Sequence, residues 1–242
     1  MTLLDLTLPT PAENLACDEA LLDAAEAGEA DETLRFWESP EYFVVVGYAN
    51  QVAAEVNVAA CAARNIPILR RCSGGGTVLQ GPGCLNYALV LRITTSGPTR
   101  NISTANEFIM ERNRTAIASA LRTPHSALRV QGHTDLVHGD LKFSGNAQRR
   151  RKDFLLFHGT FLLNFDLTLI GEFLRAPTRQ PDYRLGRSHL EFVRNLPMPA
   201  AVVKASLCQA WGGLTTQPAA PAQRVRQLCA ERYDLPAWNH QR

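Results

Sequence analysis

Alternating apolar and polar positions mark several short segments of the chain as β-strands. Thr33–Trp37 and Tyr42–Val46 are rich in apolar, β-branched and aromatic residues, and Ser39-Pro40 separates them. Ile66–Leu69 is a short apolar run, and Leu85–Ile93 alternates as a half-buried strand does. We therefore expect these four segments to build part of a β-sheet.

A second group of strands is expected in the middle of the chain. The alternation runs through residues 132–137, turns at His138-Gly139-Asp140 and continues through Leu141–Gln148. A charged tip, Arg149–Asp153, then leads into the apolar run Phe154–Leu163. Because turn residues recur at short spacing, these segments are predicted to be antiparallel strands joined by hairpins.

Helical spacing of apolar residues appears in the remaining segments. The first helix is predicted from Pro11 to about Ala27, with Thr10 as N-cap and Glu13 completing a capping box. A second long helix is expected over Ser103–Leu121, with Ser103 as its cap. Further helices are predicted at Val52–Ala63, Leu167–Leu174, Ala200–Trp211 and Ala222–Arg232.

The order of these elements predicts an α/β (α+β) domain. Strands and helices are mixed without a regular strand–helix–strand rhythm, which favours a sandwich-like arrangement of sheet and helices. At 242 residues the chain fits a single domain, 1–242, and Thr215–Pro221 is its one low-complexity stretch. Ala176–Asn195 is a long, basic, proline-bearing segment and a candidate active-site loop.

Composition narrows the class of protein. Lys and Arg number 25 and Asp and Glu number 23, so the net charge is +2, and nucleic acid is not the expected partner. No apolar run is long enough for a membrane span, and the N-terminus lacks a basic signal-peptide region. The six cysteines are scattered without a Cys-x-x-Cys pair, which argues against zinc and fits reduced thiols in the cytoplasm.

The most informative stretch is the glycine-rich segment that follows Arg70-Arg71. Ser73 is followed by Gly74, Gly75 and Gly76, and residues without a Cβ let the backbone approach a ligand closely. Successive N–H groups in such a loop suit a carboxylate or a phosphate. It is not a P-loop, because Gly-x-x-x-x-Gly-Lys-Ser/Thr is absent. A plain surface loop between two strands remains the alternative interpretation.

Polar residues on the middle strands suggest where chemistry takes place. Lys142 precedes Ser144-Gly145, so a cation can lie beside a close backbone approach, as a phosphate ester or an activated carboxylate would require. Asp135 is a candidate ligand for Mg²⁺. Considered by itself, Lys142 is better interpreted as a solvated strand residue than as a catalytic group.

Two further features have a simple and a functional interpretation. His158 lies in an otherwise apolar strand and is either a satisfied core histidine or a ligand or base. The run Arg149–Lys152 is either a solvated hairpin tip or a dock for an acidic protein partner.

Taken together, these motifs resemble the lipoate–protein ligase family, which belongs to the wider biotin/lipoyl protein ligase fold group. The family pattern Arg-Arg-x-Ser-Gly-Gly-Gly-x-Val matches residues 70–78. Asp-Leu matches Asp135-Leu136, Lys-x-x-Gly-x-Ala matches Lys142–Ala147, and His-Gly-Thr-Leu-Leu is similar to His158–Leu162. The resemblance implies mixed, largely antiparallel sheets flanked by helices.

The resemblance also implies a two-step reaction. The carboxylate of lipoate or octanoate attacks the α-phosphate of Mg²⁺·ATP to give an acyl-adenylate, and a lysine of a carrier protein then attacks that mixed anhydride. Lys142 is the implied catalytic residue. The positions implied to bind substrate or adenylate are Arg71, Ser73, Gly74, Gly75, Gly76, Thr77, Asn86, Asp135, Ser144, Gly145, Ala147, His158, Gly159 and Thr160.

The implied partner is a lipoyl-accepting carrier protein, either an acidic lipoyl domain or a glycine-cleavage H-type protein. Many ligases also carry a C-terminal accessory domain, whereas this chain ends soon after Trp238. We therefore expect no separate accessory domain here, and possibilities include a separate accessory subunit, a self-sufficient short ligase, or an enzyme that handles only pre-formed adenylate.

The chain departs from the ligase pattern after the glycines. Ligases commonly have His-Asp-x-Gly-Asn where this chain has Gln80–Cys84, and the Gly-Pro-Gly turn is closer to octanoyltransferases, which use no ATP. Those enzymes need a cysteine nucleophile after the His-Gly motif. Ala176–Asn195 contains no cysteine, which favours the ligase. An ATP-independent transferase and a non-catalytic lipoyl-binding protein remain alternatives.

Overall fold

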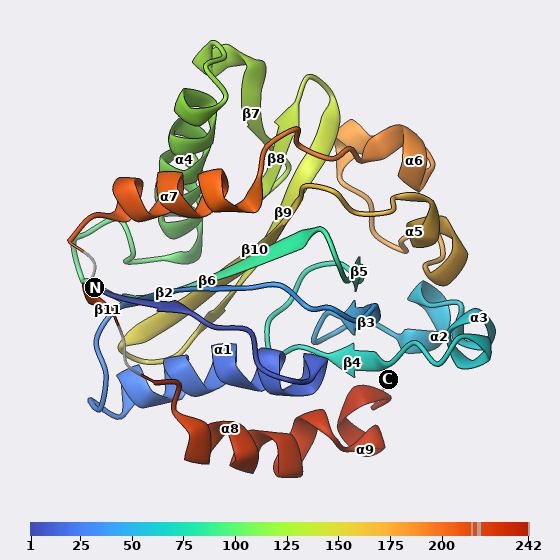
Figure 1. The fold of residues 1–242 in the computed structure, drawn as a ribbon, viewed down its shortest axis with the longest axis horizontal. Helices are drawn as coiled ribbons and strands as arrows, with labels where there is room; N and C mark the ends of the chain where they lie inside the picture. Colours follow the sequence, from blue (N-terminus) through green and yellow to red (C-terminus); the bar gives the residue numbers. More distant parts are fainter. Residues whose placement is uncertain (214, 217–218, 242) are drawn as a thin grey trace.

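The computed structural model describes residues 1–213, 215–216 and 219–241, so part of the low-complexity stretch, residues 217–218, lies outside the described residues. Figure 1 shows a large sheet between two groups of helices, with a smaller sheet beside it. The strands are β1 Thr2–Asp5, β2 Thr33–Trp37, β3 Phe43–Val46, β4 Ile68–Arg70, β5 Val78–Gln80, β6 Cys84–Arg92, β7 Leu128–Gln131, β8 Asp135–His138, β9 Leu141–Arg150, β10 Phe154–Leu162 and β11 Thr215–Thr216. The helices are α1 Pro11–Glu26, α2 Val52–Glu55, α3 Val58–Ala63, α4 Ile102–Ala120, α5 Thr168–Phe173, α6 His189–Phe192, α7 Ala200–Trp211, α8 Ala222–Leu228 and α9 Pro236–Asn239.

The large sheet is mixed and mostly antiparallel, as predicted. Its strand order is β11-β1-β2-β6-β10-β9-β8-β7, and only β1 pairs in parallel, with β2 and β11. The hairpins from β7 through β10 are antiparallel, which confirms the prediction for the middle of the chain. The smaller sheet has the order β4-β3-β5.

Helix α1 has the predicted start, whereas two other predicted helices were wrong in detail. Thr10 and Glu13 form the expected capping box. The segment predicted as one helix over Val52–Ala63 is two short helices, because Val56 is extended and pairs with Leu174. Helix α4 is capped by Asn101 rather than by Ser103, since the Asn101 side chain accepts a hydrogen bond from the Thr104 amide at 2.9 Å.

The two faces of the large sheet are covered by different helices (Figure 1). The first, which we call the α1 face, carries Trp37, Ala88 and Leu156 and packs against α1 and α8. The second, the α4 face, carries Phe36 and Tyr87 among others and packs against α4 and α7. Because side chains alternate along a strand, each position on β6, β9 and β10 is assigned to one face by its register.

The candidate active-site loop Ala176–Asn195 contains short elements of secondary structure that the sequence did not predict. It contains a single 3₁₀ turn at Asp182–Arg184 and the short helix α6. Its end runs along β9: Val193 forms a bridge with Lys142, and the Arg194 amide donates to the Lys142 carbonyl at 2.9 Å. The segment therefore lies directly against the strand that carries Lys142.

The basic hairpin tip Arg149–Asp153 contacts helix α1. The Arg151 guanidinium lies 2.9 Å from the Asp23 carboxylate, and the Glu26 carboxylate accepts hydrogen bonds from the amides of residues 152–154. The tip is therefore fastened to the C-terminal end of α1. Within the part of the chain that the structure describes, no helix has the length and apolarity needed to cross a bilayer.

Candidate active site

The glycine loop, Ser73–Thr77, joins β4 to β5 and is built around the Arg71 side chain. Arg71 Nε donates to Ser73 Oγ at 3.1 Å, and Nη2 donates to the carbonyls of Gly74 and Gly76 at 2.5 and 2.7 Å. Burial of this guanidinium lowers its pKa to about 10. Since its donors turn toward the loop carbonyls, Arg71 shapes the loop from within, and its positive charge lies beneath it.

The outer side of the glycine loop is open. Gly74, Gly75 and Gly76 are all exposed, and a Cβ added at Gly74 or Gly76 would meet nothing within 4 Å. Gly75 has φ +86°, which a residue with a side chain rarely adopts. Asn50 fixes the far end of the loop by donating to the Gly75 carbonyl at 3.1 Å and to Thr77 Oγ1 at 3.3 Å.

Lys142 lies across Gly145 and is held by Asp135. A Cβ at Gly145 would come within 2.8 Å of both Lys142 Cε and Nζ, so with any other residue here the end of the lysine side chain would have to shift. Lys142 Nζ is 2.8 Å from Asp135 Oδ1, and the Tyr183 hydroxyl donates to Asp135 Oδ2 at 2.7 Å. Burial, together with the Asp135 carboxylate, raises the pKa of Tyr183, so the phenol stays protonated as a donor.

The glycine loop and Lys142 meet over the same strand. The Cβ position of Gly75 is 3.5 Å from the Ala147 side chain, while Lys142 covers Gly145. Gly145 and Ala147 are two residues apart on β9 and therefore share the α1 face. The glycine loop and the Lys142 ammonium thus lie over neighbouring positions of β9.

A cross-strand row of residues leads away from Lys142 over the α1 face. We call it the polar row: Asp135, Gly145, Thr160 and Asn86 are directly paired from β8 to β6. Gln80 donates through Nε2 to Thr160 Oγ1 at 2.6 Å, and Thr160 donates to Asn86 Oδ1 at 2.6 Å. The predicted residues Thr160 and Asn86 therefore lie in line with Lys142 and Gly145.

His158 is part of a buried chain that runs from the glycine loop to the core. Ser73 Oγ lies 2.5 Å from His158 Nε2, and His158 Nδ1 lies 3.3 Å from Asp18 Oδ2. Asp18 in turn pairs with Arg35 at 2.5 Å. Burial alone would raise the pKa of Asp18, but Arg35 and the His158 hydrogen bond outweigh it and lower the pKa.

The hydrogen-bonded series Ser73–His158–Asp18 resembles a serine nucleophile with its base and orienting acid. Its surroundings, however, indicate a structural role. Ser73 is only 1% exposed, and its oxygen already accepts a hydrogen bond from Arg71. A nucleophile has to reach its substrate. The chain Ser73–His158–Asp18 instead anchors the start of the glycine loop to β10 and α1.

Two predicted site residues point away from the others. Ser144 is buried on the α4 face and accepts a hydrogen bond from Asn146 Nδ2 at 3.3 Å. The Cβ position of Gly159 also lies on the α4 face, where a side chain would collide with Asn146 Oδ1. That oxygen accepts the Tyr87 hydroxyl at 2.7 Å. Side chains at positions 144 and 159 therefore serve the packing of the sheet.

The sequence interpretation did not include Asp18, Arg35 or Tyr183 among the site residues. The arginine inside the otherwise apolar strand β2 was a visible signal, because a charge is rarely buried without a partner, whereas Asp18 is one of five acidic residues in α1. Tyr183 lies in the segment already proposed as an active-site loop, but only the folded chain brings its hydroxyl to Asp135.

The Asp135 carboxylate does not fit a resident magnesium ion. One oxygen is engaged by Lys142 and the other by Tyr183. Among the residues whose positions are described, no group of three His, Cys, Asp or Glu side chains could enclose a metal. We therefore assign Asp135 to the positioning of Lys142 and derive no step through a metal bound to it.

None of the six cysteines is presented as a nucleophile. All six are free, and all are buried except the partly exposed Cys208. Burial, with the nearby Glu19 carboxylate, raises the pKa of Cys72 to about 12, and burial also raises the pKa of Cys84. A thiol needs to ionise to attack an acyl group, so these two residues are unsuited to carrying a thioester.

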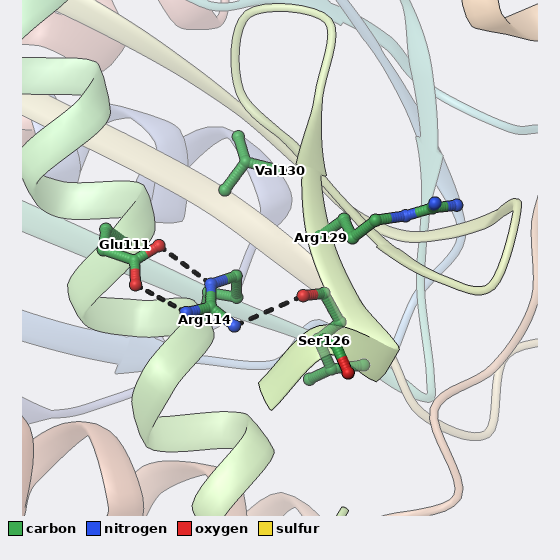
Figure 2. Close-up of a pocket in the computed structure, with 6 residues that line it drawn as sticks. Glu111, Arg114, Ser126, Arg129 and Val130 are labelled. Carbon is green, nitrogen blue, oxygen red and sulfur yellow. Dashed lines mark hydrogen bonds and ion pairs between the residues drawn. The ribbon is translucent and has the colours of Figure 1, made fainter. Parts of the chain in front are cut away.

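Two surface hollows lie on the other side of the large sheet. The hollow in Figure 2, about 470 Å³, is bordered by Glu111 and Arg114 of α4 and by Arg129 and Val130 of β7. The Arg114 guanidinium is paired with Glu111 at 2.5 Å. A second hollow of about 820 Å³ lies between α4 and α7. No predicted site residue lines either hollow.

Comparison with known proteins identifies a family. Residues 10–203 match the family described as the lipoyl protein ligase A/B catalytic domain. The octanoyltransferase LipM of Halalkalibacterium halodurans is 26% identical, with 95% of this chain and 94% of that protein covered. The lipoate-protein ligase A subunit 1 of Thermoplasma acidophilum is 28% identical, with 79% and 74% covered.

Other relatives are considerably longer than this chain. A Schizosaccharomyces pombe relative is 31% identical over 69% of this chain, but the match spans 42% of its own length. The match to an Aeropyrum pernix relative spans 58% of that protein's own length.

Solved structures show the same fold. A Thermoplasma acidophilum protein solved with bound lipoic acid aligns with a TM-score of 0.83 at 21% identity, with 99% of this chain and 98% of that chain covered. A lipoate-protein ligase A solved with ATP aligns with a TM-score of 0.79 at 23% identity, with the same coverage.

Proposed function

The chain belongs to the lipoyl protein ligase A/B catalytic domain family, and from this premise we propose that it attaches lipoate or octanoate to a lysine of a carrier protein, using ATP and passing through an acyl-adenylate. The observation that carries the proposal is the convergence of Lys142 and the glycine loop on Gly145 and Ala147 of β9. A cation beside an exposed glycine loop suits an acyl phosphate, which is anionic and has to be held close to the backbone.

In the first step both reactants are anions. The carboxylate attacks the α-phosphorus, and the bond from that phosphorus to the bridging oxygen breaks, so that pyrophosphate leaves. The Lys142 side chain is 24% exposed and is paired with Asp135. Its ammonium group offsets the repulsion between the two anionic reactants. Magnesium enters this scheme with ATP, as part of the substrate.

In the second step a carrier-protein lysine attacks the acyl carbon and AMP leaves. The attacking amine has an ordinary pKa of about 10.4 and has to lose a proton first. The segment Ala176–Asn195 reaches the site through Tyr183, whose hydroxyl contacts Asp135. In the proposed reaction this brings the segment next to the adenylate. A segment in this position limits access of water to the reactive anhydride.

An ATP-independent acyltransferase is the second candidate, because the chain resembles an octanoyltransferase LipM over 95% of its length. A transferase of the cysteine type needs an ionisable thiol near the acyl group. Burial raises the pKa of Cys72 and Cys84, and 176–195 contains no cysteine. These observations favour the ligase.

The test is the intact mass of an apo lipoyl domain incubated with the protein and octanoate or lipoate, with and without Mg²⁺·ATP. We expect addition of one acyl group and release of pyrophosphate only when ATP is present. Lys142→Met should abolish both, whereas Lys204→Met, which removes a lysine paired with Asp5 at the surface, should not. Because one relative is named as a subunit of a ligase, the same reaction is also run with an accessory subunit added.

Three results would contradict this proposal. Acyl transfer from an octanoylated carrier without ATP, blocked by Cys72→Ser or Cys84→Ser, would establish the transferase. If lipoate still binds to Lys142→Met, and neither the unaltered protein nor this variant shows turnover, the protein would be a non-catalytic binding protein. Absence of any acylation, even with the accessory subunit, would refute the enzyme assignment altogether.

A further inference from the structure

Helix α9 lies beside β4, the strand that leads into the glycine loop (Figure 1). β4 is at the edge of the small sheet, so its outward-facing main-chain groups take their partners from elsewhere. Two side chains of α9 supply these partners at Arg70. Asn239 Oδ1 accepts a hydrogen bond from the Arg70 amide at 2.9 Å, and Trp238 Nε1 donates to the Arg70 carbonyl at 2.9 Å. The end of the chain is therefore joined to the start of the Arg-Arg-glycine motif.

The Arg70 side chain extends this connection to the turn Gly47–Asn50. Its Nε donates to the Trp238 carbonyl at 3.2 Å. Its Nη1 donates to three carbonyls of the turn, those of residues 47, 48 and 50, at 2.9, 3.1 and 2.8 Å. Because Arg70 is 0% exposed, these are buried hydrogen bonds from a charged group, which are the stronger kind. Arg70 thus fixes the turn relative to α9.

The same turn contacts the glycine loop on its other side. The Tyr48 amide donates to the Ser73 carbonyl at 2.9 Å, and Asn50 Nδ2 donates to the Gly75 carbonyl at 3.1 Å. A Cβ at Gly47 would lie 2.1 Å from the Gly75 carbonyl oxygen, so the two backbones pack directly against each other. A movement of the turn therefore has to move the loop.

We infer that Trp238 and Asn239 are positioning residues for the glycine loop, and that they act through Arg70 and the turn Gly47–Asn50. The inference rests on the proposed function in one respect, since the loop is taken to bind the acyl phosphate. The two arginines of the Arg-Arg pair then have different tasks. Arg71 shapes the loop from within, whereas Arg70 fixes the turn against which the loop packs.

The test is the variant Trp238→Phe, which keeps an aromatic ring but removes the donor to the Arg70 carbonyl. Trp211→Phe is the matched control, because Trp211 Nε1 also donates one hydrogen bond, to Asn113 Oδ1 at 3.0 Å, but on the α4 face. Each of the two indoles also has a second aromatic ring and an arginine beside it. We therefore expect urea unfolding to show similar losses of stability in the two variants.

Hydrogen exchange of the Tyr48 amide is the first measurement that separates positioning from stability. This amide joins the turn to the loop, and its exchange requires no substrate. We expect exchange about threefold to tenfold faster in Trp238→Phe, because the loss of one hydrogen bond shifts local opening by about that factor. Trp211→Phe should exchange at the rate of the unaltered protein.

The second measurement is the KM for octanoate or lipoate in ATP-dependent pyrophosphate release. In Trp238→Phe it should rise by about threefold to tenfold, with a smaller change in kcat, because binding then has to order the turn and the loop as well. Trp211→Phe should keep the KM of the unaltered protein. A loss of stability alone would raise KM in neither variant.

Asn50→Ala tests the route, because it removes the side chain that connects the turn to the Gly75 carbonyl. If Trp238 acts through the turn, Trp238→Phe should raise KM by a smaller factor in the Asn50→Ala protein than in the unaltered one. Fully additive effects of the two changes would overturn the inference, since independent contributions do not share a route.

The remaining outcomes separate the inference from the proposed function. Equal Tyr48 exchange and equal KM in Trp238→Phe and Trp211→Phe overturn the inference and leave the proposed function intact. If the unaltered protein releases no pyrophosphate, the proposed function fails, and unchanged Tyr48 exchange would overturn the inference as well. Should Trp238→Phe not fold, Asn239→Ala takes its place, because it removes the acceptor of the Arg70 amide.

Discussion

Lys142 Nζ lies 2.8 Å from Asp135 Oδ1, across the hairpin formed by β8 and β9. The pairing depends on an irregularity, because Leu136 pairs with Ser144 but Val137 pairs with Lys142, so β9 contains one additional residue there. In a regular strand, Lys142 and Gly145 would point to opposite faces. The bulge brings the lysine over Gly145, next to the glycine loop.

Asp135→Asn should lower acylation without unfolding the protein. The change removes the charge that holds the Lys142 ammonium, while Tyr183 can still donate to the remaining carbonyl oxygen. Because a displaced catalytic group costs far more rate than stability, we expect a loss of about tenfold or more in acylation. Initial rates by intact mass and the midpoint of urea unfolding measure the two effects.

The control for this change is Asp140→Asn. Asp140 pairs with Arg129 at the surface, with its side chain 81% exposed, and such pairs contribute little. An Asp135→Asn protein as active as the Asp140→Asn protein would exclude the positioning role of Asp135.

Gly145→Ala should impair the site by steric conflict alone. A Cβ at this position comes within 2.8 Å of Lys142 Cε and Nζ, so the ammonium has to move away from Asp135. We expect acylation to fall by about tenfold to a hundredfold, the scale of a misplacement of about 1 Å. The matched variant Gly171→Ala adds a methyl group that meets nothing within 4 Å and should keep full activity. Equal activity of the two variants would show that Lys142 is not constrained here.

The Asp18–Arg35 pair should make stability depend on acid pH. Burial opposes ionisation of Asp18, but Arg35 and His158 lower its pKa below the ordinary value of 3.8. Because the folded-state pKa is the lower one, the stabilisation is complete above about pH 4 and is lost as the pH falls through the folded-state pKa. Urea unfolding between neutral and acid pH measures this loss.

Asp18→Asn should remove that part of the acid dependence and destabilise the fold at neutral pH. Arg35 is fully buried, so loss of its partner should cost about 3 kcal/mol or more. Asp5→Asn, at the exposed pair with Lys204, serves as the control. A neutral-pH stability of Asp18→Asn equal to that of the control would contradict a bracing role of this pair.

Much of the fold follows from local patterns, and the exceptions have tertiary causes. The capping box of α1 and the hairpins from β8 to β10 are local features, and both predictions were confirmed. The break in the helix predicted over Val52–Ala63 depends on Leu174, more than a hundred residues away, which pairs with Val56. Helical spacing within the segment contains no trace of that partner.

The candidate site divides in the same way. Lys142, the three glycines and His158 were identified from the order and spacing of short motifs. The faces of Ser144 and Gly159 depend on which neighbours each strand pairs with, and the partners of Arg71 depend on how the loop folds back. Motif spacing therefore identified positions without assigning what each side chain contacts.

The sequence by itself determined the class of fold, the family and the cluster of motifs that bear chemistry, because these depend on residue types and their local order. Tertiary structure alone decided that Lys142 meets Asp135 and Gly145, and that Gln80 lies over Thr160. The physical reason is that these contacts arise from strand register, one bulge and the docking of the small sheet on the large one. Each is set by packing between segments that are distant in the chain.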